Sequence, residues 1–255
     1  MHKKRLIFTL LYADGYFFIS RNFQLQKVGN SKWLNKNYNF KNIASSIDEL
    51  IILNVSRKEK DQIKFISAVQ EVIEGVFVPV ALGGGIRTME DASLFLSSGA
   101  DKIVVNTLIE EDRSVIKELV SKYGSQCIVA SIDYRLVDKS MIAFTNNGEK
   151  QVSMTLEEYI LKIKNLNVGE IFINSIDRDG TGQGYDFKSL IFLSNIIDIP
   201  IIISGGAGKK EHFLEVLLSN EFDAASTAHL FNFIGNGLPL SRSFLLKNDV
   251  SLAKW

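Results

Sequence analysis

Short apolar runs alternate along the chain with longer segments in which apolar residues recur every three or four positions. The longer segments, such as 90–100 and 156–167, are typical of amphipathic helices, and the short runs are typical of buried strands. The predicted strands are 5–12, 49–54, 78–82, 102–105, 127–132, 170–174, 200–203 and 223–226. Eight such strand-and-helix units in 255 residues predict a single α/β domain over 1–255, a parallel (β/α)8 TIM barrel rather than an open sheet.

The first apolar run needs a separate explanation, because residues 4–21 read KRLIFTLLYADGYFFISR. A basic start before an apolar run also occurs in secretory leaders. Here the run is short, and Asp14 follows it without a small-residue cleavage site. A strand covered on both faces explains the run better, and the aromatic residues 16–18 after it predict a packed hairpin. No stretch of about 18 apolar residues could span a bilayer, so we expect no membrane association.

Composition and charge narrow the function classes. The chain is 46% hydrophobic and carries 29 basic and 29 acidic residues. This balance argues against a protein that binds nucleic acid through phosphate contacts. Cys127 is the only cysteine, so a reducing, cytoplasmic setting is expected, and its apolar surroundings predict a packed thiol within a strand. The three histidines are scattered, so we expect no metal site and no cofactor.

The chain also contains an internal repeat, with an offset of 121 or 122 residues. The offset aligns Pro79 with Pro200, Gly84 with Gly205, Gly85 with Gly206, Glu49 with Glu170 and Leu11 with Asp133. Agreement at so many points predicts two copies of a half-barrel, about 1–125 and 126–255. A barrel with this symmetry can hold two equivalent anion sites at its mouth.

The aligned glycines predict where those anion sites lie. Backbone N–H groups approach a phosphate closely where no Cβ intrudes, and the next helix N-terminus adds its dipole. One predicted phosphate site consists of Gly84, Gly85, Asn106 and Thr107, and the other of Gly205, Gly206, Thr227, Ala228 and His229. The alternatives are that the glycines only form tight turns and that His229 is a surface or capping residue.

Four segments give the chain a resemblance over nearly its whole length. They are GGGIRTMEDAS, GADKIVVNT, SIDRDGTGQGYD and SGGAGKKEHF. They resemble HisF, the cyclase subunit of imidazole glycerol phosphate synthase in histidine biosynthesis. The resemblance implies a barrel that takes ammonia through its interior from a separate glutaminase subunit and cyclises a substrate carrying two phosphates, with release of a carboxamide ribotide.

The resemblance implies active-site roles for two carboxylates, whereas a third carboxylate of the family is absent from this sequence. Asp133 matches a catalytic acid of the family, Asp179 matches a further active-site carboxylate, and Thr181 follows it on a phosphate-facing loop. Asp177 is better explained as a turn residue that caps the next helix. Leu11 stands where the family has its other catalytic aspartate.

Two further positions have lost charge relative to the family. Ile19 matches a lysine and Asn54 matches an aspartate. We therefore expect the standard cyclisation to be slow, absent or replaced by amination or amidination of another phosphorylated or nucleotide-linked substrate. Such a reaction would fit surface-polysaccharide pathways, where some paralogues occur.

Four charged residues begin predicted strands at the opposite end of the barrel. Arg5, Glu49, Lys102 and Glu170 match the family's ammonia gate, and Asp101 matches a residue that contacts the glutaminase. The alternative is that they are ordinary solvated charges at strand starts. Two other functions stay open: a metal-free phosphoribosyl isomerase of the related HisA-like barrel, which needs no gate, and a catalytically silent scaffold for the glutaminase.

Overall fold

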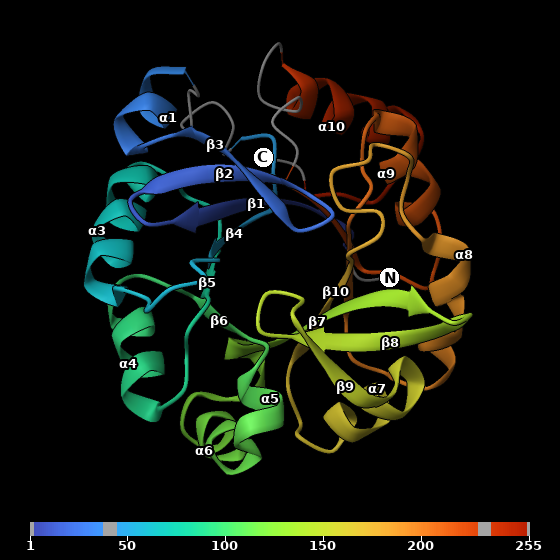
Figure 1. Cartoon of the computed structure of the whole chain (residues 1–255). Coiled ribbons are helices and arrows are strands. Elements are labelled where there is room, and N and C mark those ends of the chain that lie inside the picture. Colours follow the sequence, from blue (N-terminus) through green and yellow to red (C-terminus); the bar gives the residue numbers. More distant parts are fainter. Residues whose placement is uncertain (1–2, 38–44, 229–235, 254–255) are drawn as a thin grey trace.

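The computed structural model describes residues 3–37, 45–228 and 236–253 of the chain (Figure 1). Within these ranges, eight parallel strands close into a barrel surrounded by helices, so the predicted (β/α)8 fold is confirmed. The barrel strands are β1 (Arg5–Ala13), β4 (Glu49–Asn54), β5 (Val80–Gly83), β6 (Lys102–Val105), β7 (Ile128–Val137), β10 (Glu170–Ser175), β11 (Ile201–Ser204) and β12 (Ala224–Thr227). They follow one another around the barrel in chain order, and β12 pairs with β1 to close it.

Helices lie between the strands on the outside of the barrel (Figure 1). They are α1 (Ser31–Asn37), α3 (Gln62–Ile73), α4 (Met89–Ser97), α5 (Leu108–Glu111), α6 (Arg113–Tyr123), α7 (Leu156–Lys164), α8 (Phe187–Leu190), α9 (Lys210–Leu217) and α10 (Gly237–Lys247). Reciprocal side-chain and backbone hydrogen bonds begin α4 at Thr88 and Asp91, and α7 at Thr155 and Glu158. The two predicted helices therefore start within one residue of the expected position and end three residues earlier than expected, at Ser97 and Lys164.

Two apolar layers hold the barrel together. One inner residue from each barrel strand fills the interior: Ile7, Ile51, Ala81, Val104, Val129, Phe172, Ile202 and Ala224. A larger cluster, which includes Phe65, Phe95 and Phe213, packs between the strands and the helices. Because every barrel strand is covered on both sides, its sequence is a nearly continuous apolar run, and the sequence pattern finds it readily.

Two antiparallel hairpins extend strands at repeat-equivalent places. β2 (Tyr16–Arg21) and β3 (Gln24–Gly29) follow β1, as the aromatic residues predict, and β8 (Ser140–Thr145) and β9 (Lys150–Thr155) follow β7. The sequence pattern missed the second hairpin, and the predicted strand 127–132 was too short, since β7 continues to Val137 to pair with β8. The extended part of β7 is half exposed, so no apolar run marks it.

The half-barrel repeat is visible in the hydrogen bonding. The Asp101 carboxylate, just before β6, accepts a hydrogen bond from the Val80 N–H (2.8 Å), and Asp223, just before β12, does the same for Ile201 (3.0 Å). The two glycine pairs also share a backbone conformation, with φ of +99° and +89° at Gly84 and Gly85 and +88° and +105° at Gly205 and Gly206. Both halves therefore form the same turns at the same places.

Two local expectations were wrong. Cys127 closes a short 3-10 helix (Ser125–Cys127) and does not lie in β7, although it still packs against the outer core. The carboxylate of Asp177 accepts a hydrogen bond from the Leu136 N–H (2.9 Å) and caps no helix. It does so because the unpredicted extension of β7 lies beside the Asp177 turn.

Candidate active site

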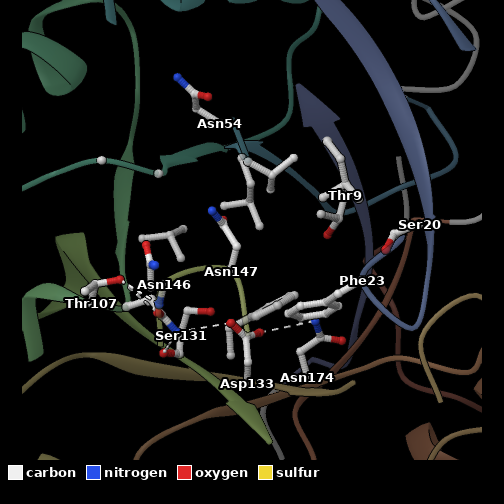
Figure 2. Close-up of a pocket in the computed structure, with 18 of the residues that line it drawn as sticks. Thr9, Ser20, Phe23, Asn54, Thr107, Ser131, Asp133, Asn146, Asn147 and Asn174 are labelled. Carbon is white, nitrogen blue, oxygen red and sulfur yellow. Dashed lines mark hydrogen bonds between the residues drawn. The ribbon is translucent and has the colours of Figure 1, made fainter. Parts of the chain in front are cut away.

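A cavity of about 140 Å³ opens at the C-terminal ends of the barrel strands. In Figure 2, Thr9 and Asn54 lie on one side of it, and Asp133 and Asn174 lie on the other. Both hairpins reach its rim, with Phe23 from the β2–β3 hairpin and Asn147 from the β8–β9 hairpin among the lining residues. A cavity at this face is where (β/α)8 barrels place their active sites.

Asp133 ends the inner face of β7 and points into this cavity. Its carboxylate accepts hydrogen bonds from the side-chain amides of Asn174 (3.3 Å) and Asn106 (3.2 Å). Burial raises the pKa of Asp133 to about 7; the bond from Asn174 opposes the rise, and the nearby Asp179 adds to it. A carboxyl group that titrates near neutral pH can both take up and release a proton, as a general acid-base residue must.

The raised pKa of Asp133 predicts a pH-dependent difference in stability. Because the folded state holds the proton more tightly than the unfolded state, Asp133 costs stability increasingly from about pH 4 to about pH 7, and fully above that. Asp133→Asn should therefore gain stability relative to the wild type across this range, where each unit of pKa shift corresponds to about 1.4 kcal/mol. The measurement is urea unfolding between pH 4 and pH 8.5.

Asp138→Asn is the matched control, because it removes the same charge at an exposed turn. Its stability difference from the wild type should change little over the same pH range. A difference for Asp133→Asn that stays constant with pH would contradict the raised pKa.

Asp179 is buried and holds the first hairpin over the cavity. Its carboxylate accepts hydrogen bonds from the Ser20 hydroxyl (2.5 Å) and the Phe23 N–H (3.0 Å). Its backbone carbonyl accepts the Asn22 N–H (2.9 Å). The residue therefore lines the cavity with Asp133 and also anchors the β2–β3 hairpin, which comes from the other half of the barrel.

The wall formed by β1 and β4 is largely apolar. Leu11 is only 9% exposed and lines the cavity beside Leu53, its register partner on β4. Thr9 lies one inward position below Leu11, and its hydroxyl shares a hydrogen bond with that of Ser226 (2.7 Å). No carboxylate comes from either strand at this level, because Asn54 ends β4.

The first glycine pair borders the cavity at this same wall. Gly84 and Gly85 line it together with Asn106 and Thr107, as the sequence predicts for one phosphate site. At Gly84 the backbone packs so closely that a Cβ atom would lie 2.1 Å from the Asn54 carbonyl oxygen. The hydroxyl of Thr107 accepts a hydrogen bond from the Asn146 N–H (3.1 Å), so it also ties the second hairpin to this rim.

The second glycine pair borders a separate cavity of about 30 Å³. Gly205, Gly206, Thr227 and Ala228 line it, together with Ile19. The hydroxyl of Thr181 donates to the Arg178 carbonyl within its own turn (2.7 Å), and Thr181 lines neither cavity. His229 lies outside the described residues.

A closed ring of charges lies at the opposite end of the barrel. Arg5 binds Glu49 (2.8 Å) and Glu170, and Lys102 binds the same two carboxylates (3.0 and 2.9 Å). Both glutamates are nearly fully buried, and burial is the largest contribution to the raised pKa of Glu49, which Lys102 opposes. The four residues predicted separately from the sequence therefore form one connected network directly below the inner apolar layer.

Comparison with known proteins places this architecture in a family. The sequence model of the family described as "Histidine biosynthesis protein" matches residues 24–234. The chain belongs to the HisF family. It is 45% identical over 100% of its length to a protein of Parasynechococcus marenigrum provisionally named imidazole glycerol phosphate synthase subunit hisF2, and covers 95% of it. It is 35% identical to subunit HisF of a Thermotoga species and 35% to that of Pyrococcus furiosus, covering 98% of each.

As a HisF-family member, the protein is an enzyme subunit, and several of its site residues had no signal in the sequence. Asn174 and Ser20 touch the two carboxylates from elements more than 40 residues away. Lys60 lies at the rim beside Gly85, but the sequence around it contains charges of both signs and indicates only a surface loop. The inward alternation along β10 could have indicated Asn174, since it lies two positions after Phe172.

The structure also bears on metal binding and on membrane insertion. Among the described residues, no three His, Cys, Asp or Glu side chains gather as a metal site requires. In the same part of the chain, no helix is long and apolar enough to cross a membrane.

Proposed function

We propose that this protein is the synthase subunit of a glutamine amidotransferase complex. It receives ammonia from a HisH-type glutaminase docked at the N-terminal face of the barrel, passes it through the interior, and uses it on a phosphorylated substrate at the C-terminal face. The observation that carries this proposal is the ring of Arg5, Glu49, Lys102 and Glu170 on the barrel axis.

Burying the charged side chains of the ring costs free energy, so their presence suggests a function. Removing two carboxylates from water is unfavourable, and apolar side chains of similar size would often close the barrel at no cost in stability. The side chain of Lys102 is 20% exposed, so the ring lies between bulk water and the apolar interior. In this proposal, neutral ammonia crosses the apolar layer above the ring, whereas an ion would lose its hydration there at a large cost in free energy.

The docking face supplies a second support. Asp101 lies next to Lys102 at this face and is exposed. One of its carboxylate oxygens accepts the Val80 N–H, and in this proposal the other oxygen contacts the partner. Phe77, 94% exposed just before β5, adds an apolar contact on the same side of the barrel. A charged gate beside an exposed aromatic residue suits a protein partner better than open solvent.

For the reaction itself, we propose divergence from the standard cyclisation. Asp133 and Asp179 serve as the carboxylates at the mouth, and Asp133 carries the proton transfer. Leu11 removes the second acid, so amination or amidination of a phosphorylated or nucleotide-linked sugar, as in surface-polysaccharide synthesis, suits this site better. The five asparagines that line the cavity, at 54, 106, 146, 147 and 174, offer donors and acceptors to such a polar substrate.

The partner and the gate are tested together. Co-expression with a glutaminase encoded beside this protein should give a stable heterodimer. Lys102→Ala should then lower glutamine-driven turnover more than turnover with free ammonium, because it opens the ring that controls ammonia entry. The measurement is the ratio of the two rates in the purified complex.

Lys162→Ala is the matched control for this test. Lys162 also pairs with a glutamate at 3.0 Å and its side chain is 21% exposed, but it lies on α7 outside the barrel. It should leave the ratio unchanged. If the two proteins do not associate at micromolar concentration, or if Lys102→Ala affects both nitrogen sources equally, the gate-free isomerase becomes the better account. A complex that activates the glutaminase without consuming ammonia would instead favour the scaffold.

A further inference from the structure

The two predicted phosphate sites differ in charge, although their glycine backbones are alike. Arg57, Lys60 and Arg87 line the cavity at the first pair, Gly84 and Gly85. No lysine or arginine lines the smaller cavity at the second pair, as far as the described residues extend, and its one charged lining residue is Asp179. Arg178 Cβ would lie 3.2 Å from a Cβ atom on Gly206, but Arg178 lines neither cavity. The repeat therefore preserves the turns but not the cations that line the two cavities.

Lys60 is the cation of the three that is left without a carboxylate. Arg57 pairs with Glu149 (3.2 Å) and Arg87 with Glu111 (2.6 Å). In the described part of the chain Lys60 makes no ion pair; its Nζ donates to the carbonyls of Asn54 (2.7 Å) and Ser56 (2.8 Å), which leaves one N–H. Burial lowers the pKa of Lys60 to about 8, Arg87 lowers it further, and Asp14 opposes the change. Its charge is therefore under-compensated.

The surroundings of Lys60 face the same glycines. A Cβ atom on Gly85 would lie 2.6 Å from Lys60 Cδ and 2.5 Å from Gln62 Nε2, so both side chains cover this turn. Gln62 opens the twelve-residue helix α3, whose N-terminus favours negative charge. Asn54 is 2% exposed and lines the cavity, yet its side-chain N–H donors have no partner among the residues that the structure describes. Buried donors are rarely left unpaired, so an acceptor from a ligand suits this place.

We propose that Lys60 recognises the charged end of the substrate, a phosphate or diphosphate group held at Gly84 and Gly85. The end of the substrate near Gly205 and Gly206 then carries a group that needs no lysine or arginine. This inference rests on the proposed use of a phosphorylated substrate and makes that substrate electrostatically asymmetric. A sugar that carries a single terminal phosphate or diphosphate group has this asymmetry, whereas a molecule with one phosphate at each end does not.

The test is a site-resolved NMR titration of the isolated barrel with sulfate and with pyrophosphate. The amide resonances of Gly84 and Gly85 should move at lower anion concentration than those of Gly205 and Gly206. Lys60→Met should weaken pyrophosphate binding at the first pair roughly 10–100-fold, the usual value of a hydrogen bond to a charged group. Lys58→Met, an exposed change in the same loop, should alter it less than about twofold.

The pH dependence of anion binding is measured with sulfate, because sulfate does not change its charge between pH 7 and pH 9. Wild-type binding at the first pair should weaken from pH 7 to pH 9 as Lys60 loses its proton, and Lys60→Arg should bind more tightly than the wild type at pH 9. The Lys60→Arg comparison decides the matter if Lys60→Met unfolds. Earlier or equal saturation of Gly205 and Gly206, no binding at Gly84 and Gly85, or no effect of the Lys60 changes overturns the inference. The anion titration uses the isolated barrel, so its outcome does not depend on association with the glutaminase. The association experiment tests the proposed function separately.

Discussion

Unmodified protein supplied with free ammonium is expected to carry out the family's cyclisation about 10²–10⁴-fold more slowly than a HisF with both acids. Leu11 cannot transfer a proton, and Asp133 on β7 and Asp179 in the turn after β10 both belong to the other half of the barrel. Asp14 lies beyond β1 at an exposed turn with φ of +49°. Leu11→Asp should recover part of the rate, measured as steady-state turnover.

Leu53→Asp is the matched control for this gain. It places the same carboxyl on the next strand, at the position that pairs with Leu11 in the barrel register. Both variants bury a new acid, so both should lose stability, but only Leu11→Asp should gain cyclisation. Ordinary turnover in the unmodified protein would show that another group replaces the missing acid, and the proposed divergence would be wrong.

Arg242→Met is expected to lower the free energy of unfolding by about 3–5 kcal/mol. Arg242 on α10 makes two hydrogen bonds of 3.0 Å with Asp48, and the side chains are only 8% and 4% exposed. Asp48 also accepts the Leu6 N–H (2.8 Å), so the pair fastens the C-terminal helix to the β1–β4 entry. Removing the arginine leaves a buried carboxylate without its cation. Urea unfolding measures the loss.

Two further variants separate the lost charge pair from lost packing. Arg242→Met combined with Asp48→Asn should recover more than half of the loss, because asparagine is neutral and still accepts the Leu6 N–H. Arg113→Met, whose ion pair with Glu110 is on the surface, should cost no more than about 1 kcal/mol. An Arg242→Met protein as stable as Arg113→Met would contradict this role.

The sequence predicted the barrel well because buried parallel strands leave a direct signal. Each strand has water on neither face, so its residues are apolar without interruption, and the glycine pairs mark the turns that follow. The extension of β7 and the β8–β9 hairpin gave no such signal, because SMIAFT and KQVSMT are only partly buried and resemble loop sequence.

The positions of candidate site residues on the barrel strands were predictable from the sequence, whereas the contacts between loops were not. Asp133 and the four ring residues lie on strands, where register fixes their neighbours once the fold is known. The anchoring of the first hairpin by Asp179 depends on residues 156 and 159 positions away, and Lys60 acquires its setting from a turn of the next unit. Neither distance in sequence nor residue type reveals such contacts.

The ring of charges also bears on how the two half-barrels recognise each other. Glu49 and Glu170 are equivalent under the repeat, but both cations, Arg5 and Lys102, come from the first half. A pair of second halves would bury two carboxylates with no cation, and a pair of first halves would gather four cations around two carboxylates. Only the mixed pair is neutral. The ring thus disfavours the assembly of either half with its own copy, so the present charges would not suit a barrel made of two identical halves.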